Sequence, residues 1–246
     1  MLEVQGLTIH AGGKALVQDL SLALPDTSLT CLIGPSGCGK SSVVKWLSGV
    51  LAPELTATGT ARLNGDDIAP PHRDIAYQPQ QDTLFPWLTI TENASLGLEI
   101  RGSRPREARD RVRALFDTFG LHGHEDSFPD QLSGGMRQRA AFLRTIVQDT
   151  RVLLLDEPFS ALDAVTRLKM QDWLIARLDA EPRTVLMVTH DLYEATQLAD
   201  RILVMAGGPG RITADIPITT PRAARSEAAL AEIRSTLRTM LLEETP

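Results

Sequence analysis

The sequence has 246 residues, of which 43% are hydrophobic and 23% are charged, proportions that are ordinary for a soluble globular protein. This length allows one large α/β domain with room for a subdomain. The formal net charge of −6 argues against nucleic acid as the main partner, and the apolar runs are far shorter than the roughly 20 residues that cross a bilayer. The first residues lack a basic start followed by an apolar core, so we expect no secretory signal and a cytosolic chain.

The start of the chain contains short strand-like runs separated by turn residues: Leu2–Ile9, Leu20–Leu24 and Leu29–Ile33. These runs predict a β region that leads into a glycine-rich loop. Further along, Gly59–Leu63, the Asn64-Gly65 turn and Asp74–Tyr77 predict another hairpin-like region that ends at Gln78.

The glycine-rich loop has the spacing GxxxxGK[ST] and is followed by a helical pattern. We call this loop the phosphate loop. Its residues are Gly34, Pro35, Ser36, Gly37, Cys38, Gly39, Lys40 and Ser41, and Ser42 follows directly. A strand, such a loop and a helix together leave several backbone N–H groups pointing into one hollow, where the helix dipole favours negative charge. Lys40 can reach the β- and γ-phosphates, and the Ser41 hydroxyl can ligate Mg²⁺. The stretch predicts a nucleoside triphosphate site without specifying the base.

Between Pro79 and Gln131 the strand-like runs give way to helical periodicity. A helix is predicted with one apolar face, a cap at Ser103 and a stop at Gly120; the face comprises Ala108, Val112, Leu115, Phe116 and Phe119. The pattern indicates a helical subdomain. His122 and His124 lie in the next loop, which is rich in Gly and acidic residues; because they have no cysteine partner, we expect them to lie in solvent.

The second half of the chain carries three more polar groups at the ends of predicted elements. The turn Ser133-Gly134-Gly135 opens a helix and is either a second phosphate contact or a plain polar helix start. The buried-strand run Val152–Leu155 ends in Asp156 and Glu157, two carboxylates that core packing alone would avoid. Another strand, Thr184–Thr189, ends at His190, and the chain closes with a helix in 222–246.

Four stretches, taken in chain order, closely resemble the motifs of ATP-binding cassette (ABC) ATPases, and the resemblance covers roughly residues 1–215. They are the phosphate loop, Leu132-Ser133-Gly134-Gly135-Met136, the paired acids Asp156 and Glu157, and Val188-Thr189-His190-Asp191. Most members have Gln where this chain has Met136. The resemblance implies an α/β P-loop core with an N-terminal antiparallel β region and an inserted α-helical subdomain. It divides a single domain into a core (1–78 and 132–221), the helical subdomain (79–131) and the C-terminal helix (222–246).

The resemblance also implies ATP and Mg²⁺ as cofactors. Asp156 would hold the metal together with Ser41, Glu157 would be the general base, and His190 would contact the γ-phosphate. A glutamine would reach the metal and the attacking water; Gln78 is assigned this role because it directly follows the strand, with Gln80 and Gln81 as close competitors. The stretch Ser160-Ala161-Leu162-Asp163 matches a loop that contacts the site of a second subunit.

The family works as a head-to-tail homodimer, with ATP held between the phosphate loop of one copy and Ser133-Gly134-Gly135 of the other. The resemblance therefore implies transmembrane permease subunits that dock around Gln78 to Leu88, an extracytoplasmic solute-binding protein, and a peripheral position at the cytoplasmic face of the membrane. The apolar stretch Leu84–Leu88 either receives the permease or folds onto the helical subdomain. Importers for nitrate, sulfonates, taurine or thiamine precursors resemble the chain most, while an exporter ATPase and a DNA-maintenance ATPase remain alternatives.

One departure from the family concerns the base. Members usually stack adenine on an aromatic residue near position 11, but Thr8–Gly13 contains no Phe, Tyr or Trp. His10 could stack instead, or adenine is held weakly.

Overall fold

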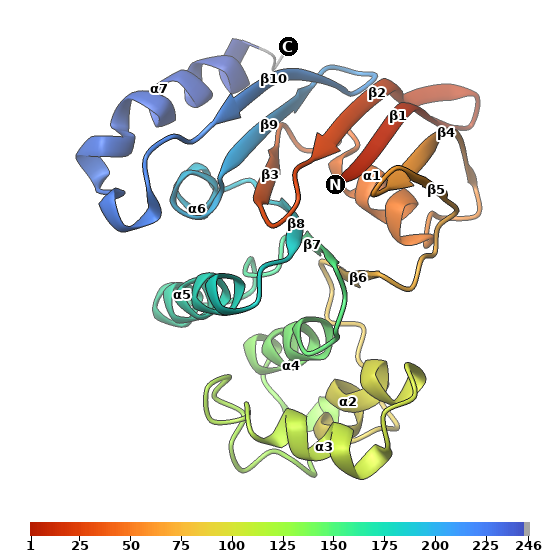
Figure 1. The fold of residues 1–246 in the computed structure, drawn as a ribbon, viewed down its shortest axis with the longest axis vertical. Helices are drawn as coiled ribbons and strands as arrows, with labels where there is room; N and C mark the ends of the chain where they lie inside the picture. The colour runs from red at the N-terminus through yellow and green to blue at the C-terminus, as the bar shows by residue number, and fades with distance from the viewer. Residues whose placement is uncertain (244–246) are drawn as a thin grey trace.

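The computed structural model describes residues 1–243. Its centre is a six-stranded sheet in the order β10-β9-β3-β8-β7-β6, in which all neighbours are parallel except β10 and β9 (Figure 1). The strands are β3 (Leu29–Ile33), β6 (Ile75–Gln78), β7 (Val152–Asp156), β8 (Thr184–Val188), β9 (Arg201–Ala206) and β10 (Arg211–Pro217).

Three of the four inner strands, β3, β7 and β8, are buried at every residue, as expected for parallel strands covered on both faces. Their side chains alternate between two hydrophobic clusters. In β7, Val152 and Leu154 join the cluster around α1 (Lys40–Ser48), whereas Leu153 and Leu155 join the cluster that contains the other helices. Because side chains alternate in this way, the position of a polar residue at the end of a strand determines the face of the sheet on which its side chain lies.

The N-terminal β region forms a separate antiparallel sheet in the order β2-β1-β4-β5. Its strands are β1 (Leu2–Ala11), β2 (Lys14–Leu24), β4 (Leu55–Leu63) and β5 (Asp66–Ile68). The Asn64-Gly65 turn joins β4 to β5, whereas β6 pairs with β7 in the central sheet, with Gln78 opposite Leu155. The predicted hairpin partner Asp74–Tyr77 was therefore wrong, because this run is the edge strand of the other sheet.

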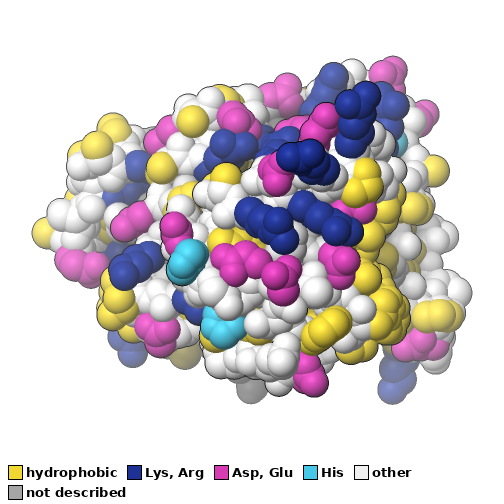
Figure 2. Space-filling model, turned by 90° about the horizontal axis from the view of Figure 1, so that it is seen from below, with side chains coloured by type: hydrophobic (Ala, Val, Ile, Leu, Met, Phe, Trp, Pro, Cys, Tyr) yellow, Lys and Arg dark blue, Asp and Glu magenta, His cyan; other side chains and the backbone are white. Residues whose placement is uncertain are grey.

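The helical end of the molecule is built from α2 (Ile90–Ile100), α3 (Pro105–Arg113) and α4 (Gly134–Ile146) (Figure 1). The predicted apolar residues Ala108, Val112, Phe116 and Phe119 are buried. The helix begins after Arg104 instead of being capped by Ser103, and it ends at Arg113 instead of Gly120, so Phe116 and Phe119 lie beyond its end. Proline is favoured at the first helical position because its fixed φ suits the helix and its missing N–H is not needed there. Figure 2 looks onto this end, where acidic and basic side chains are interspersed and hydrophobic side chains gather along one side.

The remaining helices are α5 (Ala164–Ala180), α6 (Leu192–Leu198) and α7 (Glu227–Glu243), with short 3₁₀ turns at Pro129–Gln131 and Arg222–Ala224. The predicted C-terminal helix is thus present from Glu227, and residues 244–246 of that prediction lie outside the described residues. Helix α7 packs on α6 and buries Leu230 and Leu237. Among the described residues, no helix combines the length and apolar character needed to cross a membrane.

Candidate functional site

The phosphate loop lies between β3 and α1, as the strand-loop-helix pattern predicts. A side chain at Gly34 is excluded because its Cβ would lie 2.0 Å from the Met205 carbonyl oxygen. Gly39, at the start of α1, has a left-handed φ of 101° that favours glycine. The Lys40 ammonium folds back and donates to the Gly34 and Pro35 carbonyl oxygens over 2.9 and 2.8 Å. Lys40 is therefore held at the mouth of the hollow that its own loop forms.

A metal-type pair lies at the start of α1. The Ser41 hydroxyl donates to Asp156 Oδ1 over 3.0 Å, and Asp156 is only 1% exposed at the end of β7. Burial raises the pKa of Asp156, the hydroxyl of Ser41 lowers it, and the neighbouring Glu157 raises it. A hydroxyl and a carboxylate side by side are oxygen ligands of the kind that Mg²⁺ takes. The residues present therefore fit the metal predicted here.

Glu157 is the centre of a second group. Its Oε2 accepts from Gln80 Nε2 over 3.1 Å and lies 3.2 Å from His190 Nδ1. The Glu157 backbone has a left-handed φ of 47°, a conformation that costs on the order of 1–3 kcal/mol for a residue with a side chain, and its N–H donates to the Val188 carbonyl over 3.0 Å. The structure thus brings the predicted base and the predicted histidine together in a strained turn.

The structure places the Gln78 side chain against α4. Its side chain is fully buried, its Oε1 accepts from the Thr145 hydroxyl over 2.7 Å, and its Nε2 donates to the Pro79 carbonyl over 3.3 Å. Gln78 is therefore packed toward α4, and its side-chain hydrogen bonds go to Thr145 and Pro79. Pro79 cannot donate to a strand ladder, so β6 ends at Gln78, and Gln80 is the glutamine that reaches Glu157. The proline was the signal in the sequence that favoured Gln80.

Three residues of α4, which sequence reasoning did not single out, hold the segment after β6. Arg137 pairs with Asp82 over 2.9 Å, and Gln138 Nε2 donates to the Gln80 carbonyl over 3.3 Å. Arg144 donates to the carbonyl oxygens of Asp82 and Thr83, each over 3.0 Å. These contacts join Gln80 to the helix that starts at Ser133. No local pattern marks them, because each joins positions more than 50 apart in the sequence.

The turn Ser133-Gly134-Gly135 neighbours Met136, Arg137, Ala161 and Leu162, none of which belongs to the phosphate loop. Ser133 caps α4, its hydroxyl accepts from the Met136 N–H over 3.3 Å, and Ser133 and Gly134 are exposed. A Cβ on Gly135 would lie nearest to Ala161, in the stretch Ser160–Asp163. Asp163 in turn caps α5: its carboxylate accepts a hydrogen bond from the Thr166 N–H. This bond holds the pKa of Asp163 below its usual range.

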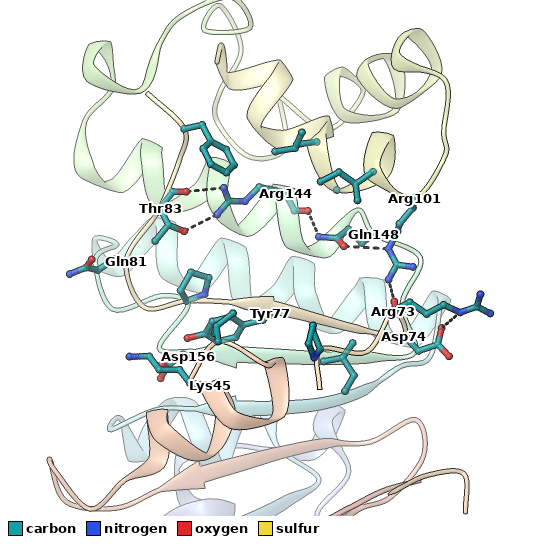
Figure 3. Close-up of a pocket in the computed structure, with 18 of the residues that line it drawn as sticks. Lys45, Arg73, Asp74, Tyr77, Gln81, Thr83, Arg101, Arg144, Gln148 and Asp156 are labelled. Carbon is teal, nitrogen blue, oxygen red and sulfur yellow. Dashed lines mark hydrogen bonds and ion pairs between the residues drawn. The ribbon is translucent and has the colours of Figure 1, made fainter. Parts of the chain in front are cut away.

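A groove of about 1470 Å³ separates the central sheet from the helical end (Figure 3). Lys45, Tyr77 and Asp156 lie at one end of it, and Arg73 and Arg101 lie at the other. The predicted docking segment contributes Gln80, Gln81, Thr83 and Phe85 to its wall. The Trp87 side chain is 69% exposed beside Phe85, with their ring centroids 5.3 Å apart.

A phosphate loop on a parallel sheet, with a buried metal-type carboxylate and a second carboxylate set beside a glutamine and a histidine, defines a P-loop nucleoside triphosphatase. Residues 17–160 match the family described as ABC transporter, and the chain belongs to that family.

The chain is 37% identical to a formylaminopyrimidine import ATP-binding protein, ThiZ, of Halalkalibacterium halodurans, over 96% of this chain and 94% of that protein. It is 37% identical to a taurine import ATP-binding protein, TauB, of Yersinia pestis, over 86% of this chain and 82% of that protein. Among solved structures, it is similar to a dimeric post-hydrolysis state of the cassette MJ0796 bound to ADP and Pi, with a TM-score of 0.78, 26% identity and coverage of 89% and 99%. These similarities confirm the predicted family, fold class and activity: the chain is an ABC ATPase that binds and hydrolyses ATP.

Proposed function

We propose that the chain is the ATPase subunit of an importer and works as a head-to-tail pair. The observation that carries the pairing is the exposed turn Ser133-Gly134-Gly135, whose N–H groups and hydroxyl suit a phosphate but which borders Ala161 instead of the chain's own phosphate loop. A second copy turned head to tail would bring this turn to the other end of a bound ATP. The relatives named for import, ThiZ and TauB, favour an importer over the alternative exporter.

The residues around Glu157 account for hydrolysis. The Glu157 carboxylate accepts the proton of a water molecule whose oxygen attacks the γ-phosphorus, and the bond from that phosphorus to the β–γ bridging oxygen breaks. Gln80 and His190 hold the carboxylate over 3.1 and 3.2 Å, so the base is oriented before the water arrives. Lys40 leaves its loop carbonyls to pair with phosphate oxygens. Ser41 and Asp156 would hold Mg²⁺, which neutralises phosphate charge when bound.

The groove in Figure 3 is the proposed permease site. It combines exposed apolar side chains, such as Ile100 at 77% and Val50 at 53% exposure, with the guanidinium groups of Arg73 and Arg101. An amphipathic segment of a membrane protein suits such a surface. The groove also reaches Gln80 and Asp156, so an occupant would lie against the segment that positions the base. A peripheral location at the cytoplasmic face of the membrane and a solute-binding protein outside it follow from this reading.

Cell fractionation tests the permease site. In native cells, the tagged parent chain should sediment with membranes, and Ile100→Glu should release it because a carboxylate replaces the apolar contact. Leu242→Glu is the matched control, since Leu242 is 64% exposed on α7, outside the groove. A parent chain that never sediments with membranes, or an Ile100→Glu chain that sediments as the parent does, would contradict the proposal.

A further inference from the structure

Arg167 lies about one turn into α5 and contacts two functional segments at once. One arm of its guanidinium donates to the Leu162 carbonyl over 3.2 Å. The other arm lies 3.5 Å from Asp191 Oδ2. Leu162 belongs to the stretch Ser160–Asp163, and Asp191 directly follows His190. One side chain therefore bridges the stretch before α5 and the segment that carries the histidine beside Glu157.

Asp191 is fixed from several directions. Its Oδ1 accepts from the N–H groups of Tyr193 and Glu194 over 2.8 and 3.2 Å and so caps α6. Its own N–H donates to the Thr189 hydroxyl over 3.1 Å. With one oxygen used in the cap, the other faces Arg167. His190 therefore lies in a short segment whose ends are both tied down.

A second contact repeats the link one turn later along α5. Gln171 Nε2 donates to Glu194 Oε1 over 2.8 Å, and both side chains are buried. We call the pairs Arg167–Asp191 and Gln171–Glu194 the α5–α6 bracket. A small hollow of about 40 Å³ lies beside the bracket, and Glu157, Ser160 and His190 line it together with Arg167. Residues of the bracket thus line the same small hollow as Glu157.

We infer that Arg167 is a positioning residue for hydrolysis: it ties the stretch Ser160–Asp163 to His190, so that a displacement of that stretch changes how the imidazole is set beside Glu157. This inference rests on the proposed head-to-tail pair, in which the exposed stretch meets the second copy. In that pair, the partner subunit would contact the stretch Ser160–Asp163. A shift of this stretch would move His190 through Arg167 and so change its position beside Glu157. The two sites of a pair would then turn over in a coupled manner.

The test uses three substitutions and one control. Arg167→Met removes both arms, and Asp191→Asn keeps the helix cap while removing the charge that faces Arg167. Arg167→Lys keeps the charge but cannot reach both Leu162 and Asp191 with one fork. Lys169→Met is the matched control, because Lys169 is exposed on the same helix. For each chain, kcat and KM for ATP, the Hill coefficient, ATP affinity and the melting temperature are measured.

Arg167→Met should lower kcat about 10-fold, because small misplacements near a reacting centre are costly in rate. KM and ATP affinity should stay within about two-fold, since the phosphate loop is untouched, and the Hill coefficient should fall toward 1. Asp191→Asn should show the same pattern, and the double variant should be no slower than the slower single one, since both act through one contact. Arg167→Lys should recover only part of kcat, and Lys169→Met should behave as the parent.

An Arg167→Met chain with parental kcat and Hill coefficient would overturn the inference. If Arg167→Met does not fold, Asp191→Asn decides, and a parental kcat in that folded variant would overturn it equally. A failure of the proposed pair would look different, because the Glu157→Gln chain would then bind ATP and remain a monomer. The inference is judged on variants of a parent that hydrolyses ATP and whose Glu157→Gln form dimerises.

Discussion

At the scale of single residues, two glutamines two positions apart have different surroundings. The Gln78 amide is buried against Thr145, while the Gln80 amide contacts Glu157. Gln80→Ala should therefore lower kcat about 10-fold or more through loss of positioning, with little change in stability. Gln78→Ala should lower the free energy of unfolding by about 1–3 kcal/mol, because it leaves a buried hydroxyl with a poorer partner.

Steady-state ATPase assays and urea unfolding of both variants separate the two roles. The account would be wrong about Gln80 if Gln78→Ala slowed hydrolysis at unchanged stability while Gln80→Ala did not. The sequence supplied both candidates and, in Pro79, one signal that favoured Gln80. It could not show that Gln78 packs against Thr145, which lies 67 positions away.

The two thiols also differ in their surroundings. Cys31 is fully buried in β3, and burial raises its pKa well above the usual range, so its reactive thiolate is disfavoured. Cys38, which is 5% exposed, lies in the phosphate loop with its sulfur 3.8 Å from Lys40 Nζ. A thiol reagent should modify Cys38 first and abolish hydrolysis, and ATP should protect it. Mass spectrometry of the labelled peptides measures this, and equal labelling of both cysteines with or without ATP would contradict it.

At the scale of elements, the stretches with a local signal were predicted well. The strand, loop and helix around Lys40 carry their own turn residues and periodicity, and so does β7 with its terminal acids. Both ends of α3 and the partner of β6 were predicted wrongly. In α3, Pro105 replaces a side-chain cap, and β6 is too short for its sequence to distinguish a hairpin strand from the edge of a parallel sheet.

Helix α7 offers a prediction at this scale. Arg234 Nε donates to the Thr196 hydroxyl of α6 over 2.8 Å, and its guanidinium lies 4.3 Å from the centre of the Tyr193 ring. Arg234→Ala should lower the free energy of unfolding by about 1–2 kcal/mol, from one hydrogen bond and one cation–π contact. Arg238→Ala is the control on the same helix, where the side chain is exposed, and should change it by less than about 0.5 kcal/mol. Equal urea-unfolding midpoints and slopes for the two variants would show that α7 is not held through Arg234.

At the scale of the whole molecule, the order of polar stretches along the chain was enough to predict the family, the fold class and ATP hydrolysis. What joins those stretches was not predictable. The contacts of Arg137, Arg144 and Arg167 connect separate elements, and the sequence around each arginine looks like any exposed helical charge. Completion of the site by a second copy is likewise an inference from where Ser133 lies.

The most direct test of the proposed pair is the size of the Glu157→Gln chain in the presence of ATP and Mg²⁺. Glutamine keeps the shape of Glu157 but removes the proton acceptor, so turnover should fall by about 10²- to 10⁴-fold and the ATP-bound pair should accumulate. On a sizing column this chain should elute as a dimer where the parent elutes as a monomer, and the Ser133→Arg/Glu157→Gln double variant should remain monomeric. A Glu157→Gln chain that hydrolyses ATP within a few-fold of the parent, or that binds ATP yet stays monomeric, would contradict the account.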